Sequence, residues 1–132
     1  MSFKSQGVLK YSVLEPNVSY KLTMVVDPGI AEFYRSMVPK HEKCKPGRYA
    51  PHVTVVRNEL PPNMTKWGAH EGLKVEFEYD ALIWHDETYW WLDCYSEFLE
   101  SVRVGLGLPA YSEWNSPPSM KSCFHMTIGN SK

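Results

Sequence analysis

The chain has 132 residues, 43% of them apolar and 14% aromatic, so it can bury one core but is too short for two independent domains. A formal net charge of −1, with 22% charged residues, excludes a disordered chain and the broad positive surface of a protein that binds duplex nucleic acid. No apolar run reaches the length of a bilayer span, and the N-terminal residues lack the apolar core of a signal peptide, so we expect a cytoplasmic protein that enters no membrane.

The first half predicts four elements in order: a strand over Tyr20–Val26, a helix over about Pro28–Val38, a basic loop over Lys40–Arg48 and a strand over Pro51–Val56. Apolar and polar residues alternate with a period of two in the strands. Asp27 has the side chain of a helix N-cap, and Pro39 cannot continue the helix, so both ends of the predicted helix are marked.

The second half predicts five further elements: strands over Leu73–Tyr79, Ala81–Trp84 and Tyr89–Asp93, a helix over Ser96–Arg103, and a strand over Cys123–Ile128 that follows Pro117-Pro118. The helix carries apolar residues at spacings of three and four. Gly105 follows it and suits a helix C-terminus.

Charge and cysteine placement narrow the class of ligand. Residues 1–66 contain ten Lys and Arg against five Asp and Glu, whereas residues 67–132 contain four against ten. The basic half favours a small phosphate-bearing ligand, and the alternative is that both sets of charges only solvate the surface. The cysteines (Cys44, Cys94 and Cys123) form no C-x-x-C pair, so we expect reduced thiols and neither a disulfide framework nor a zinc site.

Two of the predicted strands contain the same triplet. His52-Val53-Thr54 and His125-Met126-Thr127 are separated by 73 residues, and apolar residues flank both. Residues i and i+2 of a strand share a face, so each strand presents an imidazole and a hydroxyl on one side and apolar groups on the other. If the two strands lie side by side across a pseudo-twofold axis, the four polar groups meet over one cleft.

Such a pair suits the cleavage of phosphodiesters. One imidazole can take a proton from the nucleophile while the other gives a proton to the leaving oxygen, and the Thr hydroxyls can donate hydrogen bonds to the phosphate. This scheme needs no metal and no cofactor. Two alternatives remain at this point: each His is a hydrogen-bonded structural residue, or His52 and His125 bind a metal, although neither triplet contains an acidic ligand.

The two H-x-T motifs resemble the signature of the 2H phosphoesterase superfamily. Within it, Pro51–Glu59, Tyr20-Lys-Leu with Asp27-Pro28, Phe33–Ser36 and His125–Asn130 resemble the phage anti-CBASS nucleases. The resemblance implies an α+β fold of two lobes, roughly 1–66 and 67–132 of a single domain, with antiparallel sheets, outer helices and a central cleft. It also implies metal-independent cleavage of 3′–5′ linkages in the cyclic di- and trinucleotides that signal in bacterial antiphage defence.

Carried over by position, the resemblance implies His52 and His125 as general base and acid, in an order left open, and Thr54 and Thr127 as phosphate ligands. It assigns substrate binding to Tyr20, Trp84 and Arg57, with Trp67 or Trp114 as further candidates for stacking on a base; core packing is the alternative for each aromatic residue. Family members continue past the second motif with a tail that covers the ligand. This chain has five residues after Thr127, so we expect either no lid, or one supplied from elsewhere in the chain or from a second subunit of a homo-oligomer.

Two other functions fit the same motifs. A 2H phosphodiesterase of linear RNA ends or 2′,3′-cyclic phosphates uses the same catalytic groups and differs only in the pocket walls. A sponge that binds a cyclic nucleotide without cleaving it explains the aromatic residues and the basic loop, but it does not require the four intact motif residues. The expected partner in every case is a small nucleotide ligand and not duplex nucleic acid.

Overall fold

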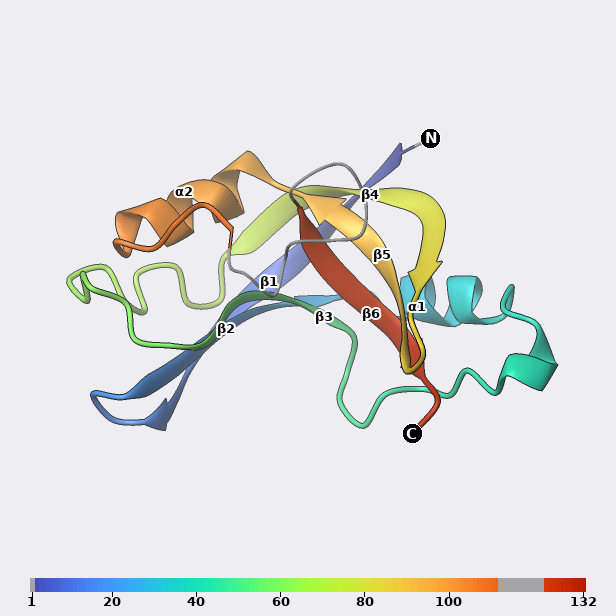
Figure 1. Cartoon of the computed structure of the whole chain (residues 1–132). Helices are drawn as coiled ribbons and strands as arrows, with labels where there is room; N and C mark the ends of the chain where they lie inside the picture. The colour runs from blue at the N-terminus through green and yellow to red at the C-terminus, as the bar shows by residue number, and fades with distance from the viewer. Residues whose placement is uncertain (1, 112–122) are drawn as a thin grey trace.

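The structure is a computed structural model that describes residues 2–111 and 123–132, and in these residues six antiparallel strands close into a barrel (Figure 1). The strands are β1 (Ser2–Glu15), β2 (Ser19–Val26), β3 (His52–Glu59), β4 (Lys74–His85), β5 (Tyr89–Tyr95) and β6 (Phe124–Asn130). The helices are α1 (Pro28–Arg35), α2 (Glu97–Gly105) and a short 3-10 helix, η1 (Lys40–Glu42). Around the barrel the strands follow the order β1-β2-β3-β6-β5-β4.

The expected two-lobed α+β fold with separate sheets is wrong. The chain forms one closed sheet because β1, which we did not predict, pairs with both halves: Gly7–Glu15 lies along β2 and Ser2–Val8 lies along β4. Exposure alternates along Lys4–Tyr11, but only Gly7 and Leu9 of the fourteen residues are buried. The inward positions include Ser5 and Gly7, so the sequence shows little of the apolar alternation that marks a half-buried strand. The two strands predicted over 73–84 are also one continuous strand, β4.

The barrel interior is packed with apolar side chains that alternate with outward-facing residues along each strand. Leu22, Met24, Val53, Leu92 and Met126 are among the side chains with no exposed surface. An eight-stranded barrel is just wide enough for side chains to fill, so a six-stranded one has no room for a ligand in its interior. A binding site must therefore lie on the outer face or at an end.

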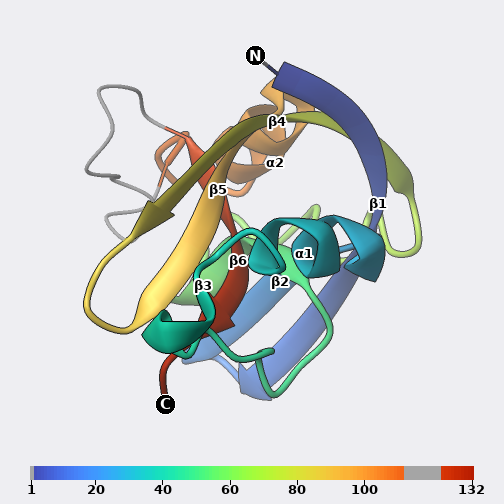
Figure 2. The same cartoon turned by 90° about the vertical axis from the view of Figure 1, so that its right-hand side faces the viewer.

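The two helices cover the ends of the barrel and do not pack on its outer face as expected. Figure 2 shows α1 across one opening, and Figure 1 shows α2 at the opposite end. Their buried residues join the barrel core: Ala31 and Tyr34 from α1, and Leu99 and Val102 from α2. Apolar side chains at the ends of a short barrel would otherwise face water, so each helix supplies the missing cover.

The start of α1 confirms the N-cap that the sequence indicated at Asp27, and α2 begins with a second N-cap, Ser96, that the sequence analysis did not identify. The Asp27 side chain accepts a hydrogen bond from the Gly29 amide at 2.9 Å, and Ser96 accepts one from the Leu99 amide at 3.2 Å. The first helix ends at Arg35, three residues before the predicted end at Val38. Within the described residues, neither helix combines the length and apolar character needed to cross a membrane.

The two halves of the chain repeat one order of elements, namely strand, strand, helix, strand. The first half is β1-β2-α1-β3 and the second is β4-β5-α2-β6. In the barrel, β3 lies beside β6 and β1 lies beside β4, which is the arrangement produced by a twofold axis that exchanges the halves. The last strand of each half carries an H-x-T motif, so this pseudosymmetry brings the two motifs together.

Candidate active site on β3 and β6

The two H-x-T motifs lie on neighbouring antiparallel strands. Val53 of β3 pairs with Met126 of β6, and both side chains point into the core with no exposed surface. The antiparallel register therefore places His52 across from Thr127 and Thr54 across from His125, all on the outer face. The register places all four residues that the sequence singled out on one face. Three of them (His52, Thr54 and Thr127) also line one cavity, and His125 is not among its lining residues.

His52 lies at the start of β3 and is half-buried. Its Nδ1 is 2.8 Å from the backbone oxygen of Ala50. A carbonyl oxygen can only accept a hydrogen bond, so Nδ1 carries the proton and Nε2 of the neutral ring holds the free lone pair. This tautomer makes Nε2 the nitrogen of His52 that can take or give a catalytic proton.

His125 has a different environment. Its side chain is 19% exposed, and its Nε2 is 3.8 Å from Oδ1 of Asp93, its cross-strand partner on β5. The ring also lies against Trp91, with the ring centroids 5.6 Å apart. Burial lowers the pKa of His125 below its ordinary value of 6.5, and the Asp93 carboxylate opposes this by raising the pKa. Burial therefore favours the neutral ring and Asp93 favours the charged one.

A β-bulge follows each motif at the equivalent position. Val55 has no partner in the register between β2 and β3, and Ile128 has none in the register between β5 and β6. Each bulge carbonyl accepts a hydrogen bond from an arginine on the helix of the other half: Arg103 Nη1 to Val55 O and Arg35 Nη1 to Ile128 O, both at 2.8 Å. Bulges commonly re-aim side chains beside active sites, and here the two arginines fix both bulges.

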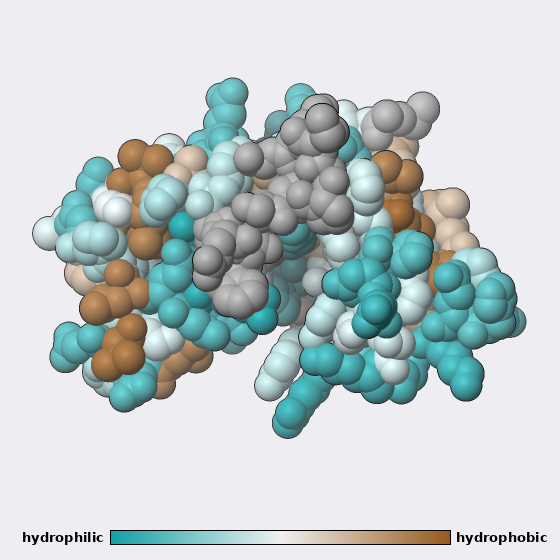
Figure 3. Space-filling view, viewed as in Figure 1, coloured by the Kyte–Doolittle hydropathy of each residue, from teal (hydrophilic) through white to brown (hydrophobic). Residues whose placement is uncertain are grey.

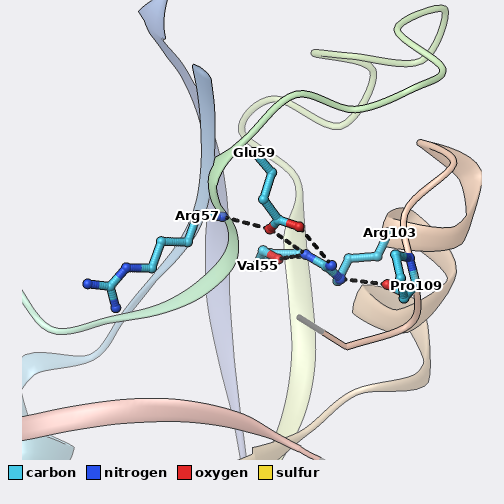
Figure 4. A network of polar contacts seen from close by, with 5 residues as sticks. All are labelled: Val55, Arg57, Glu59, Arg103 and Pro109. Atoms are coloured by element: carbon cyan, nitrogen blue, oxygen red, sulfur yellow. Dashed lines mark hydrogen bonds and ion pairs between the residues drawn. The ribbon is translucent and has the colours of Figure 1, made fainter. Parts of the chain in front are cut away.

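The Arg103 contact is part of a buried network, drawn in Figure 4. The Arg103 guanidinium forms two bonds to the Glu59 carboxylate, at 2.9 and 3.1 Å, and its Nε donates to the Pro109 oxygen at 2.7 Å. Its side chain has no exposed surface, so these partners compensate the cost of burying the charge. The network ties α2 to β3 immediately after the first motif.

A cavity of about 780 Å³ opens beside the motifs, lined by His52, Thr54 and Thr127. Four cationic side chains border it: Lys21, Arg48, Arg57 and Lys132. The space-filling view shows a hollow near the middle of the face on which β3 and β6 lie, with hydrophilic residues along its border (Figure 3). Arg57 was predicted to bind substrate, whereas Lys21, Lys132 and the rim residue Tyr89 were missed because no motif contains them.

The predicted basic loop is divided between two surfaces. Arg48 borders the cavity beside His52, but Lys40, Lys43 and Lys45 line a second depression of about 610 Å³ next to α1. The division follows from backbone pairing, because Lys45 and Asn130 exchange two hydrogen bonds that tie the loop to the end of β6. Only the C-terminal end of the loop can therefore contact a ligand at His52.

The predicted aromatic residues are not gathered at the cavity. Tyr20 is 7% exposed, and its ring packs on Trp67. Its hydroxyl accepts a hydrogen bond from the backbone N–H of Asn17. Trp84 is half-buried on β4 and pairs with Trp91, which in turn pairs with Thr127, so Trp84 shares the outer face but lies two strands away from the motif. Trp114 is outside the described residues.

Sequence analysis did not identify a group of possible metal ligands around His125. Ligand atoms of Asp93, Cys123 and His125 all lie within 4.8 Å of one another. The acidic member comes from a neighbouring strand, so inspection of the triplets alone did not reveal it. Pairing between β5 and β6 was the only signal that would have found Asp93.

Comparisons of this chain with protein-family models, with curated proteins and with solved structures give no match. Any function of this chain must therefore be inferred from its residues and their geometry. The resemblance of the H-x-T motifs to the 2H phosphoesterases stays a prediction.

Proposed function

We propose that this chain is a metal-independent phosphodiesterase that opens cyclic di- or trinucleotides at a 3′–5′ linkage, in the cytoplasm of a host cell, and thereby counteracts CBASS antiphage defence. One observation carries the phosphodiesterase chemistry: two imidazoles and two hydroxyls, from strands 73 residues apart in sequence, face outward together around the Val53–Met126 pair. The choice of a cyclic nucleotide comes from the resemblance of the motifs and their flanking residues.

The reaction needs two proton transfers at one phosphate. One imidazole takes the proton of the ribose 2′-hydroxyl, whose oxygen then attacks the phosphorus and forms the new P–O bond. The bond to the 5′-oxygen breaks, and the other imidazole gives that oxygen a proton. The product is a linear oligonucleotide with a 2′,3′-cyclic phosphate, and a single pair of histidines can supply both transfers near neutral pH.

Other groups at the site suit the developing charge. The hydroxyls of Thr54 and Thr127 lie across from the two imidazoles and can donate hydrogen bonds to the non-bridging oxygens. The cations around the cavity favour a ligand with more than one phosphate.

The size of the cavity favours a compact ligand. A volume of about 780 Å³ is within the range of about 300–1,000 Å³ typical of small-molecule sites. A duplex would instead require a broad positive surface, and the net charge of the chain is −1. A small cyclic nucleotide therefore fits the cavity and the charge better than a long nucleic acid.

The decisive experiment is incubation with a panel of cyclic di- and trinucleotides in EDTA, with linear RNA carrying a 2′,3′-cyclic end in parallel, followed by mass analysis. We expect the rings to open to products that carry a 2′,3′-cyclic phosphate or its hydrolysis product. A ring that lacks the 2′-hydroxyl beside the scissile linkage should bind and stay intact, because the nucleophile belongs to the substrate.

Each other outcome identifies a different function. Cleavage of the linear RNA alone would assign the chain to RNA-end processing. Tight binding with recovery of every ring unchanged would make it a sponge. Loss of activity in EDTA that added metal restores would overturn the metal-independent mechanism.

A further inference from the structure

The outer face of β5 and β6 contains two buried polar atoms whose hydrogen-bonding capacity is unused. Among the residues that the structure describes, Oδ1 of Asp93 and Nε2 of His125 are both buried without a hydrogen-bond partner, although only 3.8 Å separates them. The Asp93 side chain is 2% exposed. Leaving a buried polar group unpaired costs about 1–3 kcal/mol, so two such atoms only 3.8 Å apart point to a ligand that contacts both.

Cys123 completes a donor set with these two residues. It precedes β6, and its position two residues before His125 puts it on the same side of the strand. Asp93 pairs directly with His125 across the sheet. The backbone alone therefore brings a thiol, an imidazole and a carboxylate together, and their ligand atoms lie within 4.8 Å of one another.

The donor types select the class of ion. Thiolate and imidazole ligands favour zinc and similar soft or borderline cations, whereas magnesium and calcium prefer sites made of oxygen atoms only. In a tetrahedral zinc site with Zn–N and Zn–O distances near 2.1 Å, neighbouring N and O ligands lie about 3.4 Å apart. The observed 3.8 Å between Nε2 and Oδ1 needs to shorten by only a few tenths of an ångström.

We propose that Asp93, Cys123 and His125 bind one Zn²⁺ ion, with a fourth position left for water or a ligand. Three protein ligands and one open position are typical of zinc sites that exchange or react. Zinc binding itself does not depend on the function proposed above. The consequence for activity does rest on that function: an ion held by His125 occupies the nitrogen lone pair that proton transfer needs, so Zn²⁺ should inhibit the phosphodiesterase.

Binding is measured directly on the intact chain after removal of metal with EDTA and buffer exchange. Calorimetric titration with Zn²⁺ should show one site, and titration with Co²⁺ as a spectroscopic substitute should produce a thiolate-to-cobalt charge-transfer band in the near ultraviolet. The variant Cys123→Ser should lose the band, and Asp93→Asn should weaken Zn²⁺ binding by at least about tenfold, since even loss of an outer-shell partner costs about 10–100-fold.

The matched control is Cys44→Ser. Cys44 is a half-buried thiol near α1 and is not a member of the cluster, so this variant should keep the stoichiometry and the band. Circular dichroism on each variant separates loss of a ligand from loss of the fold. If Cys123→Ser unfolds the chain, Asp93→Asn still tests the site because it retains the thiol.

Three results would overturn the zinc site. They are the absence of any heat of binding in the unmodified chain, a Co²⁺ complex without a sulfur band, and binding by Cys123→Ser and Asp93→Asn that is as tight as in the unmodified chain. A water molecule that bridges Asp93 and His125 is then the remaining explanation of the two unpaired atoms. The activity measurement is separate. Zinc binding without any ring cleavage would contradict the proposed function but support the zinc site. Ring cleavage without zinc binding would support the function and contradict the zinc site.

Discussion

The two H-x-T regions have the same backbone and different surroundings. In both, a strand ends one half of the chain, a bulge follows the Thr, and an arginine from the opposite helix binds the bulge carbonyl. His52 borders an open cavity and bonds to a backbone oxygen through Nδ1, whereas His125 is largely buried beside the Asp93 carboxylate. The repeated backbone thus positions two identical side chains, and their neighbours make them chemically unequal.

For the proposed phosphodiesterase, this difference offers a way for a symmetric fold to support an asymmetric reaction. Proton transfer in both directions needs one group that is neutral and one that is charged, and surroundings that differ can hold two identical side chains in different states. The pocket contacts of His52 and the burial of His125 are such surroundings. Five measurements, taken from the largest expected effect to the smallest, break or sharpen this comparison.

Removal of either histidine should abolish turnover. We expect His52→Ala and His125→Ala each to lower kcat on a cyclic trinucleotide by about 10²–10⁴-fold, because each removes one of the two proton transfers. The double variant should be little worse than either single one, since the two groups act as a unit. His41→Ala is the matched control, because His41 lies on η1 and does not line the cavity. Near-normal turnover by either single variant contradicts the two-histidine mechanism.

The two bulge arginines should differ in their contribution to stability. Arg103→Met should lower the free energy of unfolding by about 3–5 kcal/mol, because it leaves the Glu59 carboxylate without its buried partner. Arg35 is half-buried, so Arg35→Met should cost only about 1 kcal/mol. Urea unfolding followed by circular dichroism measures both.

A double variant tests the reason for this difference. Arg103→Met combined with Glu59→Met removes both charges, so it should be less destabilised than Arg103→Met alone. Equal loss in the single and the double variant would show that packing, and not the unpaired carboxylate, causes the effect.

The pH behaviour of His125 should reveal its burial. Because burial lowers its pKa in the folded chain, the unfolded chain binds a proton at a higher pH than the folded chain does. Stability should therefore fall as the pH decreases from 6.5 toward the lowered pKa, and the variant His125→Gln should lose this part of the slope. Urea unfolding at a series of pH values in EDTA measures the slope.

Asp93 gives a second test of the same environment. Its carboxylate raises the pKa of His125, so Asp93→Asn should lower that pKa further. Proton NMR of the imidazole in EDTA follows this titration directly. A rise in the pKa would mean that the carboxylate does not act on His125 as the geometry indicates.

The smallest expected effect is a change in KM when cations of the basic loop are removed from one or the other of the two depressions that the loop borders. Arg48→Ala should raise KM for a cyclic nucleotide by a few-fold with kcat nearly unchanged, because Arg48 borders the cavity and attracts phosphate. Lys43→Ala is matched in charge and in loop, but it lines the other depression, so its KM should not change. Equal effects would mean that the whole loop acts through long-range attraction, and high salt would then remove both.

Local signals in the sequence were sufficient for most elements. Alternation identified β2, β3, β6 and the first part of β4. The N-cap Asp27 marked the start of α1, and the spacing of apolar residues indicated α2. The architecture was missed because it depends on β1, whose inward positions include Ser5 and Gly7 in place of apolar side chains. A strand that pairs on both edges but buries little leaves a weak pattern, so the closure of the sheet was not visible.

For the candidate site too, local patterns predicted some residues and could not predict others. The repeated triplets identified four residues that adjacent strands bring together, since the i, i+2 rule fixes their face from sequence alone. Asp93 and Arg103 were not identifiable, because their roles arise from pairing and packing between segments distant in sequence. Tyr20 fits the pattern of a stacking residue, yet its register on β2 places it against Trp67.

The position of β6 in the barrel has a consequence for assembly. This strand comes after all the others in the chain, but it lies between β3 and β5. Until β6 inserts, both neighbours are unpaired sheet edges, which favour association with other chains. Its insertion requires contacts between residues far apart in sequence, a kind of pairing that is intrinsically slow. The step that covers these two edges is also the step that first places the His125 strand beside the His52 strand, so the candidate site forms only when these edges are no longer exposed.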